Sequence, residues 1–169
     1  MYQIDAYVVY GNVGVCKVLD IGTLDMGGVD NKKLYYTLEP LHSNGNTIYT
    51  PVESKKVVIR DLITKDAALE MIDEIPQIET LDTESSKSNE EKYKKALKKY
   101  EFKEFIRIIK TLHLKEKERS LEGKTMTNTD KKYMDAAKDC LYSELSVTLE
   151  IPIEKVEDFI SKRLELIQS

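Results

Sequence analysis

The first sixty residues alternate between apolar and polar side chains with the period of two that is typical of short β-strands. Runs rich in Val, Tyr and Ile, which favour strands, cover residues 4–10, 13–21, 34–38, 47–50 and 57–59. Gly11-Asn12 separates the first two runs and a second Asn-Gly turn is expected at residues 43–46, because both residue types tolerate positive φ. Five short strands at this spacing predict a small SH3-like β-barrel rather than a sandwich.

The pattern changes at Thr64, which is a suitable N-cap for a short helix that continues to Ile75 and ends at Pro76. From Glu79 to Glu91 the chain is almost entirely polar and Leu81 is the one clearly apolar residue. Such a composition buries too little apolar surface to order itself, so we expect a solvated linker.

Helical periodicity dominates the rest of the chain. Apolar residues recur every three or four positions over residues 93–100, 105–112, 133–145 and 156–164. The second of these helices is expected to run to about Arg119, and Gly123 ends that region. A capping box at Thr127-Asn128-Thr129-Asp130 predicts the start of the third helix, and Pro152 fits the first turn of the last.

Taken together, the pattern predicts an α+β chain with two domains. The expected division is a β-barrel over residues 1–63, a short helix plus polar linker over residues 64–91 and an all-α domain over residues 92–169.

Charge is distributed unevenly between the two halves. Residues 1–80 contain seven basic and twelve acidic side chains, whereas residues 92–138 contain fifteen basic and seven acidic ones. This asymmetry indicates two halves with different partners, and a surplus of positive charge attracts phosphates without reading sequence.

Several classes of function are disfavoured. Cys16 and Cys140 are far apart, and neither His42 nor His113 has a partner at the spacing of a metal site or a nucleophile–base pair. No Gly-rich phosphate loop is present, so we expect neither an enzyme (a small hydrolase included) nor a cofactor. No apolar run approaches the ~18 residues of a membrane span, and no secretion signal begins the sequence, which favours a cytoplasmic location and no membrane partner.

Six segments, in order and spacing, resemble the CarD/CdnL family of bacterial transcription regulators. Its N-terminal module also occurs in transcription-repair coupling factor. The segments are Val8-Val9-Tyr10, Gly14-Val15, residues 35–41, residues 44–52, Ile109-Lys110-Thr111-Leu112 and residues 141–145. The resemblance covers nearly the whole chain.

The resemblance implies a non-enzymatic regulator. Its N-terminal domain is expected to be a Tudor-like barrel that docks on the β subunit of RNA polymerase. Its helical domain is expected to contact promoter DNA at the upstream edge of the transcription bubble, which tunes open-complex stability. The implied docking residues are Ile48, Tyr49 and Pro51. Strand side chains alternate, so Tyr49 is expected to face away from Ile48, whose alternative role is plain barrel core.

The implied DNA contacts are made by lysines. Lys94 and Lys131 match basic positions of the family, and their neighbours Lys95, Lys98, Lys99 and Lys132 are expected to join the same patch. The alternative for each lysine is a solvated helix face that binds nothing.

Two departures from the family favour a second hypothesis. Relatives commonly carry a Trp before the first helix of the second domain, which wedges into the minor groove, whereas this sequence contains no Trp. Only Leu81 is apolar in that region, and Glu91 stands about where some relatives have arginine. The alternative is therefore a protein-interaction module that binds RNA polymerase without significant DNA contact.

Overall fold

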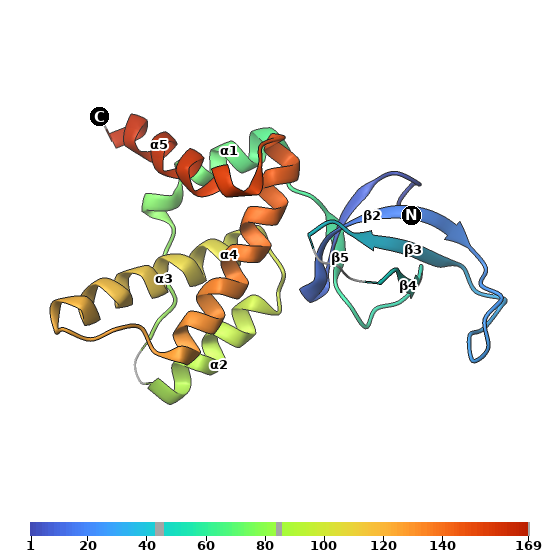
Figure 1. The fold of residues 1–169 in the computed structure, drawn as a ribbon, viewed down its shortest axis with the longest axis horizontal. Coiled ribbons are helices and arrows are strands. Elements are labelled where there is room, and N and C mark those ends of the chain that lie inside the picture. The colour runs from blue at the N-terminus through green and yellow to red at the C-terminus, as the bar shows by residue number, and fades with distance from the viewer. Residues whose placement is uncertain (43–45, 84–85, 169) are drawn as a thin grey trace. The chain divides into compact units, whose positions relative to one another are not determined.

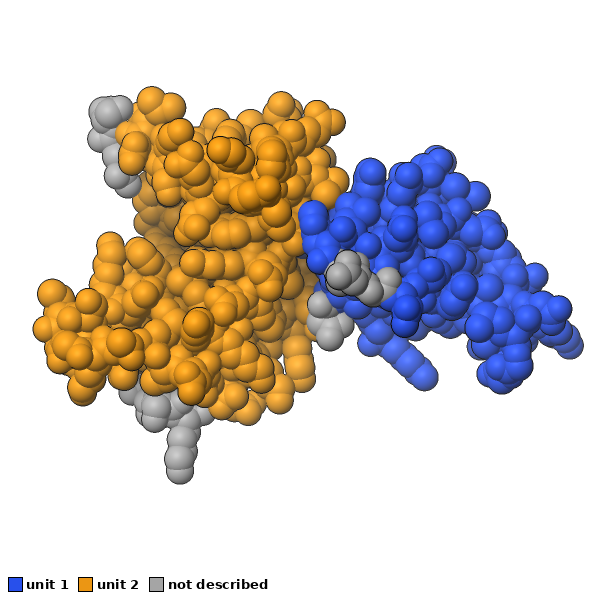
Figure 2. All heavy atoms as spheres, viewed as in Figure 1, with its two compact units in different colours: residues 1–62 blue, residues 63–169 orange. Residues whose placement is uncertain are grey.

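The computed structural model describes residues 1–42, 46–83 and 86–168. It divides into a β unit, residues 1–62, and a helical unit, residues 63–169 (Figures 1 and 2). The second predicted turn lies mostly at residues 43–45, outside the described residues. Within the described ranges, no helix is long and apolar enough to cross a membrane.

The β unit contains one antiparallel sheet with the strand order β4-β3-β2-β1-β5. Its strands are β1 (Tyr7–Tyr10), β2 (Gly14–Gly22), β3 (Tyr35–Pro40), β4 (Ile48–Pro51) and β5 (Ile59–Asp61). All five predicted strands are present, although the fifth begins at the end of its apolar run and continues through Arg60 and Asp61. The opening β1–β2 hairpin is confirmed, with a three-residue turn, Gly11–Val13, in place of two residues.

Alternating side chains of the central strands form the core of the β unit. Val8, Cys16, Val18, Tyr36 and Leu38 are at most 2% exposed. Ile48 of β4 and Ile59 of β5 pack against this one cluster from the two edges of the sheet, so the sheet is strongly curved. Burial raises the pKa of the Cys16 thiol to about 11, which keeps it protonated near neutral pH. Closure of the curved sheet into a barrel stays a prediction.

The turn of the opening hairpin requires glycine at its first position. Gly11 has a φ of +43°, and a Cβ built there would lie 2.6 Å from Cγ1 of Val57. The Gly11 amide also donates to the carbonyl of Val58 at 2.7 Å, which ties the turn to the chain entering β5.

Gly11→Ala is therefore expected to destabilise the β unit by about 1–3 kcal/mol, because it combines a left-handed backbone with a close contact. Urea denaturation followed by circular dichroism measures the change. Gly22→Ala is the matched control, since a Cβ at Gly22 meets nothing within 4 Å. Equal stability of the two variants would contradict the role assigned to Gly11.

The helical unit contains five α-helices and two short 3-10 turns among its described residues. They are α1 (Lys65–Asp73), η2 (Ile75–Gln77), α2 (Ser86–Leu97), α3 (Phe102–Leu121), α4 (Asn128–Leu149), η3 (Ile153–Lys155) and α5 (Val156–Gln168). Both predicted N-caps are confirmed. Thr64 Oγ1 accepts from the Ala67 amide at 3.2 Å, and Thr127 Oγ1 accepts from the Asp130 amide at 3.1 Å. Pro152 precedes η3 rather than standing inside the first turn of α5.

The polar linker expected over residues 79–91 is shorter than the sequence indicates, because α2 already begins at Ser86. Tertiary packing overrides the polar composition here: Tyr93 and Ala96 are buried against α3 and α4. The chain before α2 is also anchored, since the Leu81 amide donates to Thr111 Oγ1 at 2.9 Å and the Leu81 side chain packs on the same cluster.

Helix α3 lies between two apolar clusters. One cluster joins α1, α3, α4 and α5 around Phe105 and Leu145, and the other joins α2, α3 and α4 around Tyr93 and Ile108. A bidentate ion pair links α5 to α1: Arg163 Nε and Nη2 donate to the Asp73 carboxylate at 2.6 and 2.9 Å.

Candidate functional site

The edge strand β4 separates the three predicted docking residues onto two faces. Ile48 is half-buried and packs against the core of the β unit, and Thr50 is buried beside it. Tyr49 points to the opposite face and is 45% exposed, and strand alternation places Pro51 on that same face. The alternation expected for Tyr49 is present, and Ile48 contributes to the core.

Strand β4 pairs only with β3 among the described residues, which leaves one side of its backbone open. An open edge of this kind can accept a strand from another protein through main-chain hydrogen bonds. On the outer face, Tyr49 lies opposite Thr37 and Pro51 lies opposite Tyr35 of β3.

Tyr35 is a candidate docking residue that the sequence alone did not single out. It follows the same outer face as Pro51, whereas the neighbouring Tyr36 is 2% exposed in the core. Two adjacent tyrosines look alike in the sequence, and only the register between β3 and β4 tells which one faces outward.

Three of the predicted lysines form one exposed stripe at the C-terminal end of α2, with Lys98 just beyond its last residue. Lys94, Lys95 and Lys98 are exposed, have helical spacing and line a shallow groove together with Glu91 and Lys92. None of the three has an ion pair recorded within the described chain. The residue beneath them, Tyr93, is fully buried, and burial together with the charge of Asp130 raises its pKa to about 12.

Lys99 differs from these three lysines because it approaches a carboxylate. Its Nζ is 3.8 Å from Oε1 of Glu104, a side chain with 9% exposure. A lysine engaged in this way is less available to an external phosphate than its neighbours Lys94, Lys95 and Lys98.

The two predicted lysines of α4 lie near α2, the helix that carries Lys94 and Lys95. Lys131 and Lys132 are exposed in the first turns of α4. The following residue, Tyr133, packs its ring 5.8 Å from that of Tyr93 and donates to Glu90 Oε1 at 3.3 Å, which places the start of α4 beside α2. Lys132 Nζ lies 5.7 Å from the centre of the Tyr133 ring.

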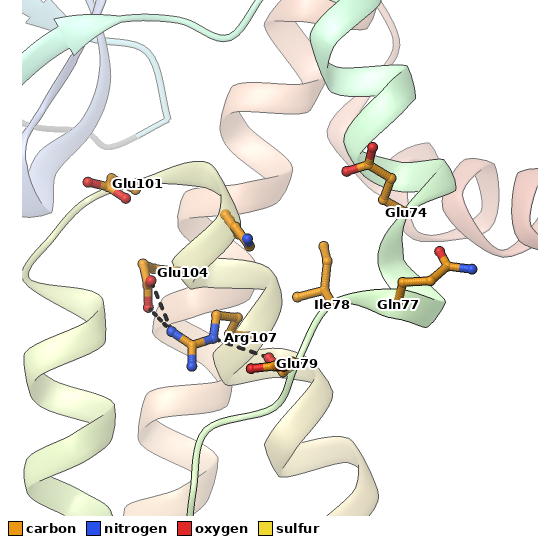
Figure 3. Close-up of a pocket in the computed structure, with 8 residues that line it drawn as sticks. Glu74, Gln77, Ile78, Glu79, Glu101, Glu104 and Arg107 are labelled. Atoms are coloured by element: carbon orange, nitrogen blue, oxygen red, sulfur yellow. Dashed lines mark hydrogen bonds and ion pairs between the residues drawn. The ribbon is translucent and has the colours of Figure 1, made fainter.

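A second concave feature, the acidic pocket, opens between α3 and the chain after α1 (Figure 3). It has a volume of about 830 Å³, and its charged lining consists of Glu74, Glu79, Glu101, Lys103, Glu104 and Arg107. Arg107 holds Glu104 with Nη1 at 3.2 and 3.3 Å from the two carboxylate oxygens, and its Nε donates to the Glu79 carbonyl at 3.1 Å. The charge of the buried Glu104 carboxylate is thus already neutralised by Arg107 in an internal ion pair.

Among the described residues, no group of three or more His, Cys, Asp and Glu side chains could hold a metal ion. In the acidic pocket, the contacts of Arg107 with Glu104 and with the Glu79 carbonyl join α3 to the chain after α1.

Most of the negative charge of the first eighty residues lies outside the β unit. Residues 1–62 contain six basic and seven acidic side chains, so the β unit is nearly neutral. The acidic excess in the first eighty residues comes from residues 63–80, which contain one basic and five acidic side chains and belong to the helical unit. The acidic excess counted over the first eighty residues therefore belongs to the helical unit and not to the β unit.

These features define a class of protein: a small, curved antiparallel β domain with an open edge strand, followed by a helical domain with exposed lysines. A family model for the CarD-like/TRCF RID domain matches residues 2–63. The N-terminal unit belongs to this family and is a CarD-like RNA polymerase-interacting domain. A search of curated proteins found no match to the chain.

Proposed function

We propose that the protein is a non-enzymatic transcription regulator. Its β unit docks on the β subunit of RNA polymerase, its helical unit contacts promoter DNA, and together they tune the stability of the open complex. The observation that carries the proposal is the match of the whole β unit to an RNA polymerase-interacting domain. An open edge strand with an exposed aromatic residue supports the same conclusion.

In the docked state, β4 adds its open backbone edge to a strand of the polymerase, and outward side chains select the partner. Tyr49 and Pro51 supply these contacts, joined by Tyr35 from β3. Ile48 supports the strand from within, because it packs on the core of the β unit.

Contact with DNA depends on phosphate attraction rather than base recognition. Lys94, Lys95, Lys98 and Lys131 are exposed and carry no ion pair recorded in the described chain, so they are the principal contacts. Lys132 contributes less to DNA binding because its ammonium lies over the Tyr133 ring. Lys99 also contributes less, because it forms an ion pair with Glu104.

Tyr49→Ala is expected to weaken binding to an isolated β-subunit lobe at least about tenfold, since an aromatic anchor at an interface is worth about 1–4 kcal/mol. Biolayer interferometry with the full chain measures the affinity. Tyr7→Ala is the matched control, because Tyr7 is 42% exposed and lies on β1, away from the open edge of β4. Docking through β4 is refuted if Tyr49→Ala binds like the unmodified protein while remaining folded.

A protein-interaction module without useful DNA contact is the second candidate, and one observation favours it. The chain has no Trp, and Leu81 is partly buried against Tyr93 and its neighbours rather than free to enter a base step. The lifetime of open complexes with and without the protein separates the candidates. If α2 and α4 contribute only structure, the charge of their lysines has no effect on that lifetime.

A further inference from the structure

Helix α2 packs against α3 and α4 through a small face that contains polar atoms without partners. Its buried residues are Asn89, Tyr93 and Ala96, which recur at helical spacing and are 6%, 0% and 4% exposed. Asn89 Oδ1 and the Tyr93 hydroxyl are both buried, and neither has a hydrogen-bond partner among the described residues. The face that holds α2 in place therefore also buries two unsatisfied polar groups.

The carboxylate whose charge acts on Tyr93 is already engaged. Lys115 Nζ lies 2.8 Å from Asp130 Oδ2, in an ion pair that joins α3 to α4 and does not include α2. The Tyr93 hydroxyl therefore has no acceptor in this cluster. A buried polar group without a partner shifts the equilibrium against the packed state by about 5- to 150-fold.

The apolar contacts that oppose this cost are few. The twelve residues of α2 contain three apolar side chains, Tyr93, Ala96 and Leu97, and Leu97 is only partly buried. The buried residues of α3 and α4 belong to both apolar clusters of the helical unit, whereas those of α2 belong to one. The pairing of α3 with α4 thus depends little on α2.

The chain turns sharply between α2 and α3. Tyr100 has a φ of +51°, a left-handed conformation that an aromatic residue rarely adopts. Two residues later, Phe102 is 5% exposed in the core. On the other side of α2, the Leu81 amide is held by Thr111 Oγ1 at 2.9 Å. Movement of α2 between these two anchored residues releases Tyr100 from its left-handed backbone.

We infer that α2 is a displaceable helix, which opens from α3 and α4 as one unit while the rest of the helical unit stays folded. Opening hydrates Asn89 Oδ1 and the Tyr93 hydroxyl, and it uncovers the buried Ile108 and Leu112 of α3. The lysine stripe moves with α2. The inference does not rest on polymerase docking through β4 or on contact with DNA.

Hydrogen exchange of the full chain, followed by mass spectrometry at urea concentrations far below unfolding, measures local opening. After correction for intrinsic rates, the amides of residues 89–97 are expected to exchange at least about tenfold faster than those of residues 105–112 and 137–145. Their rate should depend little on urea, because local opening exposes little surface. One common rate with one urea dependence in all three segments overturns the inference.

Two tyrosine variants test the cause of the opening. Tyr93→Phe removes the unpartnered hydroxyl and is expected to slow exchange of residues 89–97 about fivefold. Tyr133→Phe makes the same change on a ring 5.8 Å away, but it removes a hydrogen bond to Glu90 Oε1 and is expected to accelerate exchange of the same segment about threefold. Residues 137–145 report global stability in each variant. Unchanged or faster exchange in Tyr93→Phe overturns the inference, because the hydroxyl would then be satisfied in the packed state.

Discussion

Reversing the charge of Lys94, Lys95, Lys98 and Lys131 to glutamate is expected to weaken binding to forked duplex DNA at least about 100-fold at moderate salt. All four side chains are exposed, on α2, directly after α2 and at the start of α4. Each lost phosphate contact removes about 0.9 from the slope of log affinity against log salt concentration, so the slope should become shallower by about three to four. Fluorescence anisotropy over a salt series measures both quantities.

The matched control carries the same change in net charge on the β unit. Lys32, Lys33, Lys55 and Lys56 are also exposed, and their reversal to glutamate is expected to change DNA affinity little. If both quadruple variants lose affinity equally, net charge alone governs the interaction and the proposed DNA-contacting surface on α2 and α4 is wrong. If neither loses affinity, the protein-interaction hypothesis gains instead.

The elements of this fold were predictable wherever a local signal coincided with the tertiary packing. Thr64 and Thr127 are N-caps whose side chains satisfy backbone amides in the first turn, a requirement that is local in sequence. The strands were predictable for the same reason, since alternating apolar and polar side chains indicate a strand with one buried face. The start of α2 was not, because its polar residues become helical only when Tyr93 and Ala96 pack against α3 and α4.

The candidate sites likewise contain features that a local sequence pattern predicts and features that depend on tertiary structure. The sequence predicted correctly that Tyr49 would face away from Ile48, because a strand has a period of two. It gave no signal that Lys99 approaches Glu104, since that contact depends on the turn between α2 and α3, where Tyr100 has a φ of +51°. The division of charge follows from the predicted barrel limit, since residues 1–63 contain six basic and seven acidic side chains.

The start of the helical unit is fixed by a buried carboxylate. Glu144 of α4 is 1% exposed, and its Oε2 accepts from the Ile63 amide at 2.8 Å. One turn along the helix, Thr148 Oγ1 donates to the Ile63 carbonyl at 3.1 Å. The two side chains thereby satisfy both backbone polar groups of Ile63.

Glu144→Ala is expected to lower the free energy of unfolding of the helical unit by about 2–4 kcal/mol, because it leaves the partly buried Ile63 amide without an acceptor and removes a hydrogen bond to a charged group. Glu144→Gln keeps an acceptor oxygen and is expected to cost about 1–2 kcal/mol. Urea denaturation of the full chain, followed by the helical signal in circular dichroism, gives each value.

Asp139→Ala serves as the control, since Asp139 is an exposed acid of the same helix and its loss is expected to change stability by less than about 0.5 kcal/mol. A double-mutant cycle with Thr148→Val tests the shared target. Glu144 and Thr148 bind the backbone amide and the backbone carbonyl of Ile63, so the effects of the two substitutions on stability should couple by about 0.5 kcal/mol or more. Strict additivity, or equal stability of Glu144→Ala and Asp139→Ala, would show that Ile63 is held in place by its neighbours' packing alone.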